Sequence, residues 1–86
     1  MLTPQEAITI VLADIQRRGE AIDSICSHAE VRLELAAPLR NRQGVDDIYV
    51  VHYSIPWGLD GVSIFVELSV YTGEIYDRIG PAPYRG

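Results

Sequence analysis

The N-terminal segment has the hydrophobic period of an amphipathic helix. Its apolar residues recur at positions i, i+3, i+4 and i+7 and form one stripe: Ile8, Val11, Leu12 and Ile15. Polar residues, among them Asp14, are expected to face away from that stripe. Thr3, Pro4 and Glu6 form a T-x-x-E capping box with proline at the first helical position. The pattern therefore predicts a helix that begins at Pro4 and ends at Gly19.

Four later segments have the composition of β-strands. Residues 30–35 and 62–71 alternate apolar and polar side chains, which is typical of strands with one buried face. Residues 47–55 are rich in isoleucine, tyrosine and valine on both faces, which indicates a central strand or one whose outer face is covered. Gly73 can take the left-handed conformation of a tight turn, so residues 74–79 are expected to pair with the preceding strand as a hairpin.

The connections between these segments differ in character. Residues 20–29 are consistent with a loop that contains a helical turn, or with a segment that leads directly into a strand. Residues 38–46 contain proline, asparagine, glycine and two arginines, which marks a long connection. Residues 56–61 are dense in turn formers. Residues 80–86 contain alternating prolines, which favour an extended path for the C-terminal tail.

This order of elements predicts a single α+β domain over residues 1–86. The helix is expected to lie across one side of a four-stranded antiparallel meander, because helix and sheet each have one apolar face to bury. The predicted shared core consists of Ile8, Leu12, Ile15, Leu33, Ile64, Val66 and Leu68. The other face of the sheet is predicted to stay open to solvent and to carry Glu30, Arg32, Glu34, Ser63, Phe65, Glu67, Ser69 and Tyr71.

The composition supports one soluble domain and excludes several classes of protein. With 86 residues, 48% of them hydrophobic, the chain is long enough for one core. Cys26 is the only cysteine, which excludes an internal disulfide and a structural zinc site. The start has no basic leader and no long apolar run, so a cytoplasmic location without a membrane anchor is expected. All seven basic residues are arginines, a usage typical of bacterial or phage genomes of high GC content.

The net charge of −5 favours a protein partner over nucleic acid. Neutralising phosphates requires a stripe of basic side chains, and the arginines of this chain are scattered over its predicted elements. An acidic protein is instead suited to a basic protein partner, because opposite net charge speeds their encounter. Arg40 and Arg42 in the long connection are either solvated or contacts to an acidic partner.

No catalytic signature is present, so catalytic residues, metal ligands and cofactors are not expected. Cys26 with His28 or His52 is the nearest approach to a thiol–imidazole pair, and a small thiol enzyme is the alternative from another class. A core position is favoured for Cys26, because free cysteine is among the most buried residue types. The aspartates that flank the predicted loops are expected to make turn hydrogen bonds: Asp46, Asp47 and Asp60.

The C-terminal hairpin is similar to part of a known family. It resembles the T-G-E hairpin that closes PepSY-like domains and a class of small bacterial immunity domains, and its residues are Val70-Tyr71-Thr72-Gly73-Glu74-Ile75-Tyr76. In those families an aspartate stands two residues before the threonine, where this chain has Val70. The order of helix and meander also resembles cystatin-like folds. The resemblance implies a protein that acts by occluding another protein.

Together these features predict a non-catalytic binding protein. The expected partner is one cognate protein, such as a bacterial toxin or effector, which the chain blocks by stoichiometric binding. Aromatic anchors are expected to provide affinity and acidic residues to steer the partner, and the candidates are Trp57, Phe65 and Tyr71 with Asp60, Glu67 and Glu74. Trp57 either tucks under the edge of the sheet or projects as an anchor. The alternatives are a phage-encoded inhibitor and a homo-oligomeric structural or accessory subunit that pairs strand edges as a dimer.

Overall fold

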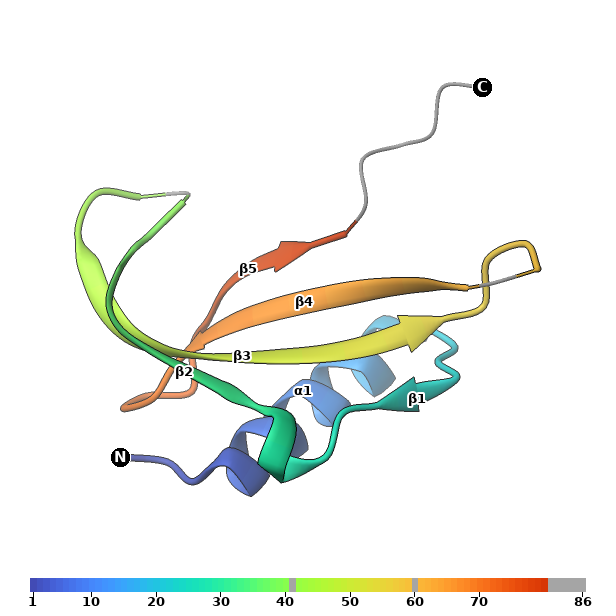
Figure 1. Cartoon of the computed structure of the whole chain (residues 1–86), viewed down its shortest axis with the longest axis horizontal. Coiled ribbons are helices and arrows are strands. Elements are labelled where there is room, and N and C mark those ends of the chain that lie inside the picture. Colours follow the sequence, from blue (N-terminus) through green and yellow to red (C-terminus); the bar gives the residue numbers. More distant parts are fainter. Residues whose placement is uncertain (41, 60, 81–86) are drawn as a thin grey trace.

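The computed structural model describes residues 1–40, 42–59 and 61–80. The described residues form one α-helix, a short strand, a 3₁₀ turn and four longer strands (Figure 1). Their bounds in chain order are α1 (Pro4–Arg18), β1 (Ser24–Ile25), η1 (His28–Glu30), β2 (Arg32–Pro38), β3 (Val45–Ile55), β4 (Val62–Ser69) and β5 (Ile75–Ile79). Within these ranges no helix has the length and apolarity needed to cross a bilayer. The predictions for Asp60 and for the tail beyond Gly80 lie outside the described residues.

Helix α1 has the two ends that its sequence predicts. Thr3 N donates to Glu6 Oε1 at 2.8 Å and Glu6 N donates to Thr3 Oγ1 at 3.1 Å, so both halves of the capping box form. Gly19 caps the other end in the left-handed conformation, with φ at 70°. Removing an N-terminal cap of this kind typically costs about 1 kcal/mol of stability. The predicted helix is therefore confirmed at both ends.

The sheet is antiparallel and is built around β3. One edge of β3 pairs with β4, and β4 pairs in turn with β5. The other edge of β3 is shared by two strands, since β1 pairs with residues 53–54 and β2 with residues between 45 and 50. The predicted α+β arrangement is confirmed as one helix packed against an antiparallel sheet, with five strands in the described residues where the sequence predicts four.

The additional strand lies in the segment for which the sequence leaves two alternatives open. Residues 20–29 contain both a strand and a helical turn, because β1 pairs with β3 and η1 follows it. Glu30 caps this turn, and Ser27 N donates to Glu30 Oε1 at 2.9 Å. Since Glu30 belongs to η1, β2 begins two residues later than the alternating pattern predicts.

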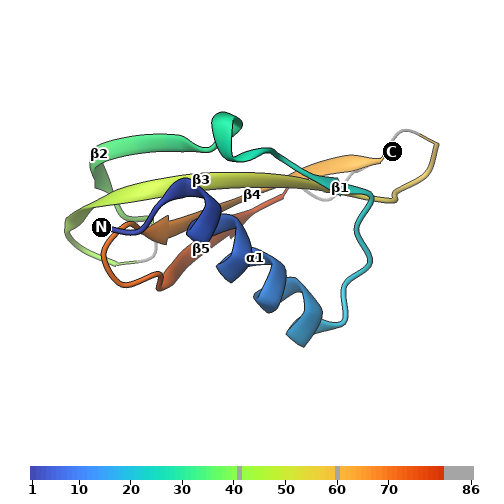
Figure 2. The same ribbon diagram turned by 90° about the horizontal axis from the view of Figure 1, so that it is seen from below.

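The main core lies between α1 and the face of the sheet toward the helix, the inner face (Figure 2). Its buried members include Ala7, Ile8, Val11 and Ile15 from the helix, with Tyr49, Val51, Tyr53, Ile64, Val66, Leu68 and Val70 from the sheet. The core predictions for Leu12 and Leu33 are wrong, since their side chains are 37% and 46% exposed. The helix turns Val11 and Asp14 inward, which moves Leu12 to its flank. Leu33 pairs with Tyr49 but lies on the edge strand β2, beside the helix and not beneath it.

The strands β2 and β3 bend near one end of the sheet (Figure 1). The register of β2 against β3 shifts between Glu34 and Ala37, which marks a β-bulge, and Ala36 has φ at 50° in the left-handed region. Ala36 N donates to Asp47 Oδ1 at 2.9 Å, which holds the bulge in place. Bulges bend the strand that carries them. The β2–β3 hairpin therefore curls over the face of the sheet opposite α1, which we call the outer face.

The outer face is only partly open, which corrects the expectation of a fully exposed surface. Under the curled hairpin a second, smaller core cluster is buried, formed by Ala37, Ile48 and Val50 with Leu39 and Tyr76 packed against them. Glu67 and Ser69 were expected to face solvent but are 8% and 1% exposed. The curled hairpin lies over Glu67, and the β4–β5 turn closes around the Ser69 hydroxyl, which accepts a hydrogen bond from Tyr71 N at 3.1 Å. Phe65 and Tyr71 remain exposed.

Truncating Leu68 to alanine is expected to lower the free energy of unfolding by about 2–5 kcal/mol, because this side chain is fully buried and its loss leaves a cavity. Leu12→Ala removes the same atoms from the exposed flank of the helix and is expected to cost about 1 kcal/mol or less. Urea unfolding of both variants measures the difference. Equal losses would contradict the inward orientation of the helix described above.

Replacing Ala36 with glycine is expected to raise the free energy of unfolding by about 1 kcal/mol, because a residue with a Cβ atom is strained in the left-handed conformation. The matched control is Ala37→Gly in the same bulge, which is expected to destabilise, because Ala37 is buried and glycine adds freedom to the unfolded chain. Thermal melting distinguishes the two, since about 1 kcal/mol moves the midpoint of a domain this size by roughly 4–8 °C. A lower midpoint for Ala36→Gly would argue against the bulge.

Candidate functional site

The outer face carries a pair of carboxylates on neighbouring strands. Glu67 on β4 pairs with Asp77 on β5, so both side chains point to the same side of the sheet. The Glu67 side chain is 11% exposed and that of Asp77 is 20% exposed. We call these two residues the acidic floor.

The connection between β2 and β3 places a guanidinium over the acidic floor. We call its described residues, 39–40 and 42–44, the arginine loop. Arg40 Nε lies 3.8 Å from Glu67 Oε2 and 3.8 Å from Asp77 Oδ2. The Arg40 side chain is itself 60% exposed. The floor is therefore covered by a cation that remains largely in solvent.

A second arginine of the loop contacts the end of the β4–β5 hairpin. Arg42 Nη2 lies 3.2 Å from Glu74 Oε2, and its guanidinium carbon lies 4.9 Å from the centre of the Tyr76 ring. The Tyr76 hydroxyl donates to Asp46 Oδ2 at 2.7 Å. This hydrogen bond lowers the pKa of Asp46 and raises the pKa of Tyr76. The loop, the hairpin and the start of β3 are thus joined by polar contacts.

Tyr71 is fixed at the same end of the sheet by the residue that holds the bulge. Its hydroxyl donates to Asp47 Oδ2, while Asp47 Oδ1 accepts from Ala36 N. The bond to Tyr71 is the main cause that lowers the pKa of Asp47, and the same bond raises the pKa of Tyr71. The Tyr71 ring therefore stays 57% exposed with its hydroxyl tethered.

Phe65 provides an exposed aromatic surface beside the acidic floor. It lies two residues before Glu67 on β4 and therefore on the same face. Its ring packs against His52 with ring centres 5.7 Å apart, and its partner on β5 is Ile79. The ring remains 39% exposed. Phe65 therefore lies next to the acidic floor, the one place on the described outer face where two carboxylates are cross-strand neighbours.

The structure separates the sequence-predicted contact residues into groups. Glu67 and Glu74 are contacted by the arginine loop through Arg40 and Arg42. Phe65 lies beside Glu67, and Tyr71 lies with Glu74 at the β4–β5 end of the sheet. Trp57 projects from the β3–β4 turn at the opposite end and is 65% exposed, so it is not tucked under the sheet. The paired strands put roughly 23 Å between these ends, at about 3.3 Å per residue. Asp60 lies outside the described residues.

Two groups on the outer face were missed or left open by the sequence. The sequence assigns Asp77 no role, because a regular hairpin around the Thr72-Gly73 turn would pair Glu67 with Arg78, and only the register shift after Glu67 brings Asp77 opposite it. For Arg40 and Arg42 the sequence allows either a solvated side chain or a contact to an acidic partner. The acids that they contact in the structure belong to this chain. Their contacts depend on the bulge at Ala36, which the alternating pattern of β2 does not signal.

A polar network on the inner face joins the helix to the sheet. Asp14 was expected to face solvent but is 6% exposed, because its carboxylate pairs with Arg78 of β5 and with Arg17. Arg78 also donates to the Tyr53 hydroxyl, which in turn donates to Glu20 Oε1 at 2.6 Å. Burial and the bond to Glu20 raise the pKa of Tyr53 to about 12. Each partly buried charge here has a partner of opposite sign, which is typical of a structural network.

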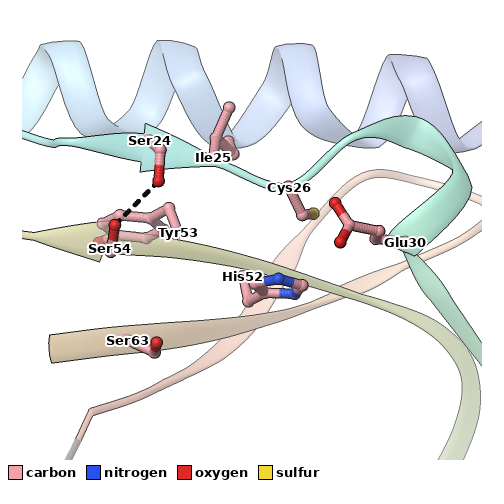
Figure 3. A pocket seen from close by; sticks show the side chains of 8 residues that line it. All are labelled: Ser24, Ile25, Cys26, Glu30, His52, Tyr53, Ser54 and Ser63. Carbon is pink, nitrogen blue, oxygen red and sulfur yellow. Dashed lines mark hydrogen bonds between the residues drawn. The ribbon is translucent and has the colours of Figure 1, made fainter.

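A pocket at the β1–β3 edge brings together the residues of the thiol-enzyme alternative (Figure 3). It is lined by Ser24, Ile25, Cys26, Glu30, His52, Tyr53, Ser54 and Ser63. Cys26 is 7% exposed, and its backbone N–H donates to the carbonyl of His52 at 2.9 Å. The Glu30 carboxylate is bound by Ser27, whose backbone hydrogen bond is the main cause of its lowered pKa. His28 does not line this pocket.

The thiol and the imidazole of this pocket are not hydrogen-bonded to each other in the described residues (Figure 3). A thiolate is activated by an imidazole in hydrogen-bond contact, and no hydrogen bond between the Cys26 thiol and His52 is present in the described part of the chain. The two serines at its rim bond to each other, with Ser24 Oγ and Ser54 Oγ 3.0 Å apart. Among residues 1–40, 42–59 and 61–80 there is also no group of three side chains that could hold a metal ion.

The fold and the outer face define a small α+β protein whose helix covers one side of an antiparallel sheet. Comparison of the chain with protein-family models, curated proteins and solved structures found no match. The resemblance of the hairpin at residues 70–76 to PepSY-like and immunity domains therefore stays a prediction.

The free energy of unfolding is expected to fall as the pH rises from about 10 to about 12. Tyr53 ionises near pH 10 in the unfolded chain and at about 12 in the folded protein, so folding favours its neutral form and that contribution is lost through this window. The chain has no lysine, which leaves tyrosines as the main groups that titrate there. Urea unfolding at several pH values measures the slope.

Tyr53→Phe is the control for this pH dependence, because it keeps the buried ring and removes the ionisable hydroxyl. The variant is expected to lose less stability between pH 10 and 12 than the parent chain, with the raised pKa values of Tyr71 and Tyr76 accounting for a residual slope. An unchanged slope would show that Tyr53 does not carry the effect.

Proposed function

We propose that the chain is a non-catalytic, cytoplasmic antagonist that binds one basic protein, of the toxin or effector type, and blocks it stoichiometrically. The observation that carries the proposal is the outer face, where the acidic floor lies beside the exposed ring of Phe65, and Glu74 and Asp46 add further acids toward the Tyr71 end. An exposed aromatic group flanked by buried and half-buried acids is suited to a partner that presents basic and apolar side chains.

Charge supports a basic partner. The chain has a net charge of −5, and acids outnumber the arginines that contact them on this part of the outer face. Opposite charges raise the rate of encounter and disfavour wrong partners. Proteins that act on nucleic acid are commonly basic, so a toxin that attacks nucleic acid fits the charge of this surface.

Phe65 is the expected anchor of the interface. Its ring is held by His52 on one side and by the Ile79 strand on the other, so little side-chain freedom remains to be lost on binding. Tyr71 is similarly tethered through Asp47. Rigid aromatic residues of this kind are frequent binding hot spots. Trp57 lies at the other end of the sheet and contributes only if the partner spans its length.

Self-association through a strand edge is the second candidate. β5 pairs only with β4 in the described chain, which leaves its other edge unpaired. That strand has five residues and includes Asp77 and Arg78. Short strands with charged side chains are the usual protection against edge pairing. We therefore favour a separate partner over a second copy of this chain.

The test is co-expression of the chain with the product of the neighbouring gene. Relief of growth inhibition and a complex of about 1:1 by light scattering are the expected results. Phe65→Ala and Glu67→Gln are each expected to weaken the complex by at least about tenfold, as loss of a hot-spot contact does. Glu34→Gln makes the same charge change on β2, where Glu34 pairs with Arg32, and is expected to have little effect.

Melting curves of all variants establish that they are folded. Full binding by both Phe65→Ala and Glu67→Gln would contradict the proposed surface. A dimer of the chain alone, stable without any partner, would favour the self-association alternative.

A further inference from the structure

Glu67 is a nearly buried carboxylate that is poorly matched by its cation. The residue is 8% exposed, and in the part of the chain that the structure describes it accepts no hydrogen bond. Its ion pair with Arg40 has a separation of 3.8 Å, whereas charge-assisted hydrogen bonds to carboxylates are usually about 2.7–2.9 Å. Asp77 faces the same guanidinium at the same distance. The acidic floor therefore holds its arginine loosely.

The shape of the floor favours a guanidinium over other cations. Two carboxylates on adjacent strands have Cβ atoms about 5 Å apart, a spacing that a planar fork of N–H donors can bridge. Tyr76 precedes Asp77 on β5, and its ring already lies under the guanidinium of Arg42. An ammonium group offers neither a fork nor a flat face for stacking.

The arginine loop is attached in a way that allows its side chains to leave. Leu39 is held by the second core cluster, and its N–H donates to the carbonyl of Gly44 at 3.1 Å, so the base of the loop is closed. The side chains of Arg40 and Arg42 are 60% and 49% exposed. The Arg40 end of the ion pairs is exposed, so its side chain can move into solvent without rearrangement of the fold. The carboxylates that it leaves are nearly buried, so another cation must then compensate their charge.

We propose that Arg40 is a built-in substitute ligand, which an arginine of the basic partner displaces from the acidic floor. In the free protein Arg40 compensates the charge of Glu67 and Asp77. On binding, the partner's guanidinium takes the fork position between the two carboxylates and Arg40 moves out to solvent. The inference rests on the proposed function, because it assigns the partner an arginine at this point of the outer face.

The experiment titrates the full chain with a hexa-arginine peptide and a hexa-lysine peptide of equal charge, with calorimetry at low ionic strength. Arg40→Gln is expected to bind the arginine peptide about fivefold more tightly than the parent chain, since the peptide no longer has to displace Arg40 from the two carboxylates. The gain should be larger for the arginine peptide than for the lysine peptide. Adding Glu67→Gln to the Arg40→Gln variant is expected to abolish this gain in affinity.

Arg18→Gln is the matched control, because it makes the same charge change at the exposed end of α1, on the other side of the sheet. It is expected to alter affinity by less than about twofold, through long-range charge alone. Arg40→Lys is a second variant for the case that Arg40→Gln does not fold, because lysine keeps the positive charge but lacks the planar set of N–H donors of arginine. It is expected to give a smaller gain for the arginine peptide.

Two outcomes would overturn the proposal. Equal changes in affinity for the arginine peptide in Arg40→Gln and Arg18→Gln would show that Arg40 acts only through net charge. If Arg40→Lys binds the arginine peptide no more tightly than the parent chain, Arg40 does not block the acidic floor. Failure of the proposed function is distinguishable from both. In that case the peptide results hold, while the complex with the neighbouring gene product is insensitive to Phe65→Ala and Glu67→Gln.

Discussion

The arrangement of the outer face depends on one bent point in the backbone. Ala36 adopts a left-handed conformation in the bulge of β2, and Asp47 holds its N–H. A regular β2 would continue flat along β3 and leave Glu67 in solvent. With the bulge, the hairpin turns back over the sheet, buries Ile48 and Val50, and brings the arginine loop over the acidic floor. Because Asp47 also accepts a hydrogen bond from the Tyr71 hydroxyl, the same carboxylate links the bend to the β4–β5 hairpin.

Most of the fold can be predicted from the sequence, because its signals are local. The capping box defines the start of α1 and Gly19 its end. Alternation, β-former composition and the Thr72-Gly73 turn together locate four strands with errors of at most three residues at either end. β1 has only two residues, which is too short for any period to reveal. The inward turn of Asp14 was not predictable from the helix alone, since it depends on Arg78, sixty-four residues later in the chain. A periodicity analysis treats every carboxylate as solvent-facing and has no means to detect such a distant partner.

The candidate site was predicted only in part, for the same reason. Phe65, Glu67 and Glu74 were selected from their own strands, and the structure places Phe65 and Glu67 side by side on the outer face and Glu74 beyond them at the β4–β5 turn. Their surroundings are contributed by the arginine loop, whose path is set by the bulge. The alanine at position 36 gives no indication of a bulge in the sequence. Trp57 was selected by residue type, but the length of β3 places it at the opposite end from Tyr71. Composition identifies side chains suited to binding, whereas distance between them is a property of topology.

The division of one edge of β3 between two strands has a consequence for the local stability of the protein. β1 contributes two paired residues to that edge and β2 contributes five. The turn η1 separates them, so β1 is expected to open more readily than β2 and without it. Opening of β1 breaks few hydrogen bonds and leaves the curled β2–β3 hairpin intact. Cys26 follows β1 and is buried in the native state, so such a local opening is expected to expose its thiol at a lower cost in free energy than unfolding of the domain.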